Sequence, residues 1–112
     1  MNKYLKNIDY AAVLDMADLV PYQDGQIVSR TLVQTGALGI TLFGFDTGEQ
    51  ISAHESKGDA LITVLDGKAE ITIGDKAFSV EKGQSLVMPS GIPHAVFAPE
   101  KLKMLLIVVF PH

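Results

Sequence analysis

The sequence predicts an all-β fold, a sandwich or barrel of short strands, and two observations carry this prediction. From Gln26 onward, β-branched, aromatic and other apolar residues gather in eight or nine short runs, most of them bounded by glycine, proline or acidic residues. Two boundaries, Asp66-Gly67 and Gly74-Asp75, contain the glycine that a tight reversing turn requires. With 112 residues the chain is long enough for one domain with one core, which we divide into an N-terminal arm at residues 1–25 and a barrel domain at residues 26–112.

The N-terminal arm shows a short helical pattern between Ile8 and Leu19. Asp9 stands where a helix N-cap is expected, and Pro21 stops the pattern. Apolar residues lie at helical offsets between them, namely Val13, Leu14 and Ala17. We expect a short helix or turn whose apolar side covers one end or edge of the barrel, because so brief a helix is not stable alone.

The β-prone runs follow in order: QIVSRTLVQ, LGITLFGF, QISAHE, ALITVL, KAEITI, KAFSV, SLVM, HAVFA and KLKMLLIVVF. The two turns predict that ALITVL, KAEITI and KAFSV form a meander. In KAEITI, apolar residues alternate with Lys68, Glu70 and Thr72, which predicts one core face and one solvent face. The last run is apolar on both faces from Leu105 to Phe110, so it is expected either at the centre of a sheet or against a second subunit.

Composition excludes several function classes. The chain has no cysteine, which rules out disulfides, thiolate metal sites and a cysteine nucleophile. Its net charge is −4, and its nine Lys and Arg form no basic stripe, so nucleic acid is not an expected partner. No segment is apolar for long enough to suggest a membrane partner or a signal peptide, and the expected location is cytoplasmic. A hydrophobic fraction of 47% favours a homodimer.

Two stretches have a fixed spacing of glycine, proline and histidine. The stretch from Gly83 to His94, GQSLVMPSGIPH, has the spacing G-x-x-x-x-x-P-x-G-x-x-H, and a partner stretch runs from Gly48 to Gly67. Together they resemble the two motifs of the cupin family of small β-barrels, over residues 40 to 110. The resemblance implies a double-stranded β-helix or jelly-roll barrel.

The resemblance also implies where a metal would bind. In cupins with a complete site, two His and a Glu of the first motif and one His of the second hold a divalent iron, manganese, nickel, copper or zinc ion. This chain has His54 and His94 at two of these positions, but Ser56 and Ala60 at the other two. Two imidazoles alone hold a divalent ion loosely, because catalytic sites normally use three protein ligands.

A third metal ligand has three candidate sources. Glu55 and Asp59 flank the empty ligand positions, and the C-terminal His112 reaches the site if the tail folds back. Glu55 is expected to point away from His54, since neighbouring side chains of a strand alternate between faces. The alternative is that the two motif histidines are neutral, hydrogen-bonded residues that line a remnant cavity.

The same alternation places Ser52, His54 and Ser56 on one face of their strand. If the two motif strands are neighbours, as in cupins, His54 and His94 face one cavity. We expect other residues to line it as well, namely Ser56, Met88, Met104 and Phe43. The alternative for the two methionines and the phenylalanine is that they are ordinary core residues.

These residues leave three functions open. The first is a cupin that binds a small molecule or a loosely held divalent metal, with its metal site incomplete and its reaction unassigned. The second is a metal-dependent enzyme that uses His54 and His94, since the family includes dioxygenases, isomerases, decarboxylases and cyclases. The third is a sensory or interaction module. The fold alone does not choose among them.

Overall fold

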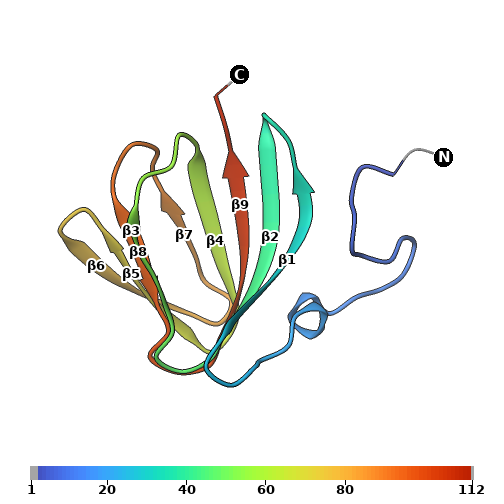
Figure 1. Cartoon of the computed structure of the whole chain (residues 1–112), viewed down its shortest axis with the longest axis horizontal. Helices are drawn as coiled ribbons and strands as arrows, with labels where there is room; N and C mark the ends of the chain where they lie inside the picture. Colours follow the sequence, from blue (N-terminus) through green and yellow to red (C-terminus); the bar gives the residue numbers. More distant parts are fainter. Residues whose placement is uncertain (1–2, 112) are drawn as a thin grey trace.

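The computed structural model describes residues 3–111, which form two antiparallel β-sheets that face each other and one short 3-10 turn, η1 (Figure 1). The turn spans Met16–Leu19. The strands are β1 (Ile27–Gln34), β2 (Leu38–Phe45), β3 (Gln50–His54), β4 (Asp59–Asp66), β5 (Lys68–Ile73), β6 (Lys76–Glu81), β7 (Ser85–Met88), β8 (His94–Phe97) and β9 (Leu102–Val109). The all-β prediction is confirmed, and the strands coincide with the nine apolar runs.

The chain crosses repeatedly between the two sheets. One sheet has the strand order β1-β2-β9-β4-β7 and the other has the order β3-β8-β5-β6. Strands from β3 to β9 change sheets at every step except the β5–β6 hairpin, as in a jelly roll. Strand β9 lies at the centre of the five-stranded sheet, which accounts for its apolar residues on both faces.

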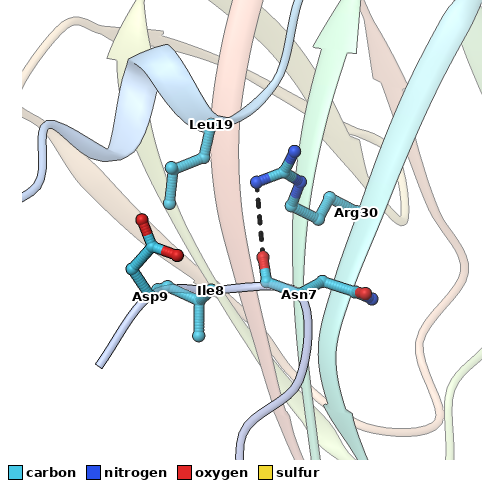
Figure 2. Close-up of a pocket in the computed structure, with 5 residues that line it drawn as sticks. All are labelled: Asn7, Ile8, Asp9, Leu19 and Arg30. Carbon is cyan, nitrogen blue, oxygen red and sulfur yellow. Dashed lines mark hydrogen bonds between the residues drawn. The ribbon is translucent and has the colours of Figure 1, made fainter.

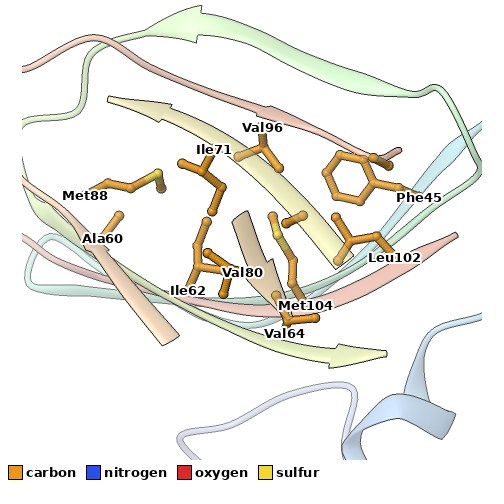
Figure 3. Packing of buried hydrophobic residues seen from close by; sticks show 12 residues of the cluster. Phe45, Ala60, Ile62, Val64, Ile71, Val80, Met88, Val96, Leu102 and Met104 are labelled. Carbon is orange, nitrogen blue, oxygen red and sulfur yellow. The ribbon is translucent and has the colours of Figure 1, made fainter. Parts of the chain in front are cut away.

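The main core fills the space between the sheets. Its largest fully buried side chains come from strands of both sheets, among them Phe45, Ile62, Ile71, Leu102 and Met104, as Figure 3 shows. On β5 the predicted alternation is confirmed, because Ala69 and Ile71 are fully buried while Glu70 and Thr72 are exposed. Burial of such side chains stabilises the fold by about 1.5 to 3 kcal/mol each.

The predicted three-strand meander is wrong in one place. The Gly74-Asp75 turn joins β5 and β6 as a hairpin, as expected. The Asp66-Gly67 turn instead carries the chain from one sheet to the other, because β4 pairs with β7 and β9 while β5 pairs with β6 and β8. Gly67 has φ +74°, and a side chain there would overlap the carbonyl oxygen of Lys101. Glycine is needed at this crossing for close packing as well as for the turn.

The short helix or turn predicted between Ile8 and Leu19 is present as the turn η1, which is limited to four residues at the end of this stretch. Asp9 caps no helix, and Val13 is fully exposed. The backbone of Ala11 has φ 53°, in the left-handed region that ends a right-handed helix.

The arm is held in place by tertiary contacts, and it lies beyond β1 on the outside of the barrel (Figure 1). The Lys6 amide donates to the carbonyl oxygen of Leu32, and Lys103 Nζ donates to that of Ala17. Val20 packs with Leu32 and Leu42 in a second buried cluster. These contacts replace the helix hydrogen bonds that the periodicity had suggested.

No helix in the described part of the chain is long and apolar enough to cross a bilayer. The predicted homodimer and the division into arm and barrel remain predictions.

Candidate ligand cavity

A cavity of about 150 Å³ lies between the two sheets, within the barrel. Apolar side chains make up most of its wall, and the polar residues in the wall are His54, Ser56 and His94. The structure brings together around this one cavity all six residues that the sequence suggested as its lining: Phe43, His54, Ser56, Met88, His94 and Met104. Ala60, at the position of the missing glutamate, lines the same cavity.

The two motif strands are neighbours, but their pairing contains an irregularity. Ile51 pairs with Val96 and His54 pairs with His94, so β3 has one more residue than β8 between these two pairs. Such a β-bulge lets residues three apart face the same side. Ile51 therefore lines the cavity with His54, whereas Ser52 is exposed and lies outside the lining. The predicted placement of Ser52 beside His54 is wrong for this reason. Strict alternation also does not predict Ile51 on the cavity side, because alternation takes no account of the bulge.

The two imidazoles contact each other at the cavity. Their ring centroids are 4.4 Å apart and the ring planes are inclined at 64°. His54 Nδ1 lies 3.0 Å from the carbonyl oxygen of Ser52, and His94 Nδ1 lies 3.3 Å from that of Ile92. Because a carbonyl oxygen only accepts hydrogen bonds, each Nδ1 carries the proton and donates it. In the neutral imidazoles the Nε2 lone pairs are then available to a ligand.

Burial keeps His94 in its neutral form. Its side chain is 4% exposed, and the loss of solvation lowers its pKa below the usual 6.5. The nearby His54 lowers the pKa further, while the hydrogen bond to Ile92 partly opposes the shift.

The lowered pKa predicts that the protein loses stability in mild acid. The unfolded chain binds a proton at His94 near pH 6.5 and the folded chain only at lower pH, so the contribution of His94 is complete above pH 6.5 and is lost as the pH falls toward the folded pKa. Thermal unfolding of the wild type and of His94→Gln at about pH 7.5 and about pH 5 tests this. The drop in melting temperature should be smaller in the variant, and equal drops would contradict the assignment.

The candidate third ligands do not complete a metal centre in the described residues. Glu55 is exposed and lies outside the cavity lining. Asp59 Oδ1 accepts a hydrogen bond of 2.9 Å from the Ser90 amide and lines a separate groove. His112 lies outside the described residues. Within residues 3–111 no three His, Cys, Asp or Glu are grouped so that they could hold an ion. The donor set around the cavity thus does not fit a catalytic centre with three protein ligands.

A wider groove lies elsewhere, between the N-terminal arm and β1, with a volume of about 480 Å³ (Figure 2). Arg30 Nη1 donates to the carbonyl oxygen of Asn7 across it, at 3.3 Å. This bond and the bond from Asn7 Nδ2 to the carbonyl oxygen of Thr31 attach the arm to the edge strand. We interpret the groove as the seam between arm and barrel, because Asn7 and Arg30 in its wall make that attachment.

Fold and cavity together define a small jelly-roll barrel with two histidines from neighbouring strands at one internal cavity. Residues 41–110 match the model of the cupin domain family, and the chain belongs to that family.

Solved structures extend the comparison over nearly the whole chain. A conserved protein of unknown function from Streptococcus pyogenes is 50% identical, with 99% of this chain and 97% of that chain covered and a TM-score of 0.97. A cupin superfamily protein from Desulfitobacterium hafniense is 33% identical, with 96% and 98% covered and a TM-score of 0.91. A cupin 2 conserved barrel domain protein from Leptotrichia buccalis is 48% identical, with 83% of this chain but 45% of that chain covered and a TM-score of 0.81. No curated protein matches the chain.

Proposed function

We propose that this cupin binds a small, largely apolar molecule in its barrel cavity, with His54 and His94 as the groups that orient it. The single observation that carries the proposal is the cavity itself, about 150 Å³ in volume and mostly apolar, with two imidazoles and one serine in its wall. Concave apolar sites with a few convergent polar groups are the usual form of small-molecule sites.

The volume limits the size of the ligand. An apolar protein cavity of about 150 Å³ holds a benzene molecule. The cavity of this barrel has the same volume, so its occupant is expected to be about the size of one six-membered ring. A larger molecule would extend out of the cavity on the side of the exposed His54.

The incomplete metal ligand set favours binding over metal-dependent catalysis. Ser56 and Ala60 both line the cavity, where the family resemblance places the second histidine and the glutamate. A serine hydroxyl and a methyl group supply neither the charge nor the third strong ligand that a catalytic ion needs. We therefore derive no reaction step through a metal.

Binding should be detectable as a rise in melting temperature. A set of molecules of about six to eight non-hydrogen atoms, at about 100 times their Kd, should stabilise the folded protein by about 2.7 kcal/mol, which raises the melting temperature by about 10 °C. Ala60→Leu should abolish the rise, because the larger side chain fills the cavity. Leu61→Val, on the next residue of β4 and outside the cavity lining, is the matched control and should keep it. Failure of every such molecule to bind the wild type would overturn the proposal.

A loosely held divalent ion is the second candidate occupant. The contact between the two imidazoles favours it, since two ring nitrogens can share one ion. Elemental analysis of untagged protein purified without chelator distinguishes the two candidates. Near-stoichiometric metal in the wild type that is lost in His54→Ala would select the ion, whereas the small-molecule proposal predicts no retained metal in either protein.

A further inference from the structure

We propose that the molecule in the cavity is a phenol: an uncharged single aromatic ring whose hydroxyl group donates a hydrogen bond to an imidazole Nε2. This inference rests on the proposed function and specifies the chemical class of the ligand. Three features of the cavity support it, namely the hydrogen-bonding roles of the imidazoles, the hydroxyl group of Ser56, and the methionine and phenylalanine side chains in the wall.

The imidazoles offer acceptors to a ligand. Both Nδ1–H groups are already used by backbone carbonyl oxygens, those of Ser52 and Ile92. The free positions are the two Nε2 lone pairs, which accept hydrogen bonds in the neutral rings. A hydroxyl group is a suitable partner for either lone pair. A carboxylate is not, because it brings only further lone pairs and a charge that must leave water.

Ser56 supplies the complementary group. Its Oγ accepts a hydrogen bond of 3.1 Å from the Gly58 amide, and the hydroxyl proton remains for a ligand. The carbonyl oxygen of Ser56 accepts from the Gly91 amide at 2.9 Å, which attaches this loop to the second motif. A phenol hydroxyl both donates and accepts, so it can meet an imidazole and the serine together. An ammonium group would bring no acceptor, and the carboxylates of Glu55 and Asp59 are absent from the cavity wall.

The rest of the wall suits an aromatic ring. Met88 and Met104, from strands on the same sheet, are 2% and 1% exposed, and both line the cavity. Figure 3 shows both side chains among the buried residues between the sheets. Phe43 lines it as well, from β2. Thioether sulfur atoms interact favourably with aromatic rings, at about 0.3 to 1.5 kcal/mol for each contact, and aromatic pairs gain a similar amount. An aliphatic alcohol of equal volume would gain neither.

Accessibility differs between the two imidazoles. His54 is exposed, whereas His94 is 4% exposed. The pair therefore extends from the surface into the interior, and Ser56 is partly buried beside it in the wall. A phenol can then enter with its ring in the apolar interior and its hydroxyl toward the imidazoles.

Isothermal titration calorimetry with five ring compounds tests the inference on the wild-type chain. Phenol should bind roughly tenfold to a hundredfold more tightly than benzene or anisole, because a buried acceptor without a donor costs about 1 to 3 kcal/mol. Phenol should also bind more tightly than cyclohexanol and benzoate. The preference for phenol over benzene should shrink in Ser56→Ala and in at least one of His54→Phe and His94→Phe, while Ser52→Ala, at an exposed serine outside the wall, should keep it.

The outcomes distinguish a failure of the phenol inference from a failure of the small-molecule proposal. If benzene, cyclohexanol or benzoate binds as tightly as phenol, the phenol inference is wrong and the small-molecule site stands. If none of the five compounds binds, both are wrong. A preference for phenol that survives unchanged in His54→Phe, in His94→Phe and in Ser56→Ala would also overturn the inference, because the hydroxyl would then be bound elsewhere.

Discussion

Substitution of Ser56 by His together with Ala60 by Glu is expected to create a tight divalent-metal site in the barrel. Both residues line the cavity that holds His54 and His94, so the double variant would offer three imidazoles and one carboxylate. Complete four-ligand zinc sites bind with about 10 to 16 kcal/mol, or roughly 3 kcal/mol for each ligand. Two added ligands should thus raise the affinity for zinc at least a hundredfold, as measured by competition with a chromophoric chelator.

The matched control places the same side chains outside the cavity. Ser52→His with Leu61→Glu changes one residue of β3, four positions before Ser56, and the residue of β4 next to Ala60, both exposed and neither in the cavity wall. This variant should bind zinc no better than the wild type. Equal affinities in the two folded double variants would contradict the assignment of Ser56 and Ala60 to the cavity.

Substitution of Gly67 by Ala is expected to destabilise the barrel severely. A Cβ at this residue would overlap the carbonyl oxygen of Lys101, and the backbone has φ +74°. The left-handed conformation costs about 1 kcal/mol and displacement of packed backbone adds about 1 to 3 kcal/mol. The expected loss is about 3 kcal/mol or more, equivalent to a fall in melting temperature of at least about 10 °C.

Gly83→Ala separates the steric effect from the conformational one. Gly83 has φ +86°, but no atom lies within 4 Å of the Cβ that would be added. We expect a loss of only about 1 kcal/mol, from the backbone conformation alone. The melting temperatures of Gly67→Ala and Gly83→Ala, measured by circular dichroism, give the loss of stability in each variant. Similar losses in both would contradict the close packing of Gly67 against the strand connection before β9.

Much of the fold follows from local sequence patterns. The apolar runs mark all nine strands, and the β5 alternation matches its buried and exposed residues because strand side chains alternate strictly in regular pairing. The pairing of β4 with β5 predicted from Asp66-Gly67 was wrong, because a local turn pattern does not specify whether the next strand pairs with its predecessor or crosses to the other sheet. In the N-terminal arm the predicted short turn is confined to η1, because contacts with distant strands position the other residues.

The cavity was predictable in part. The motif spacing brings His54 and His94 together because each begins or ends a strand of one pair. The bulge in β3 was not predictable from alternation, since it depends on how β3 and β8 pair, and it exchanges Ser52 for Ile51 in the wall. The tautomers of the two histidines also lay beyond the sequence, because they depend on the carbonyl oxygens that their Nδ1 atoms meet.

The proposed site depends most on the two imidazoles, and nitrogen-15 NMR of histidine-labelled protein tests their roles most directly. The chain contains only three histidines, so the spectrum is simple to assign with single variants. Near neutral pH, both His54 and His94 should carry a proton on Nδ1, His94 should be neutral, and phenol should shift the Nε2 signal of at least one of them. Protons on Nε2, or Nε2 signals that saturating phenol leaves unchanged, would contradict the role assigned to these residues.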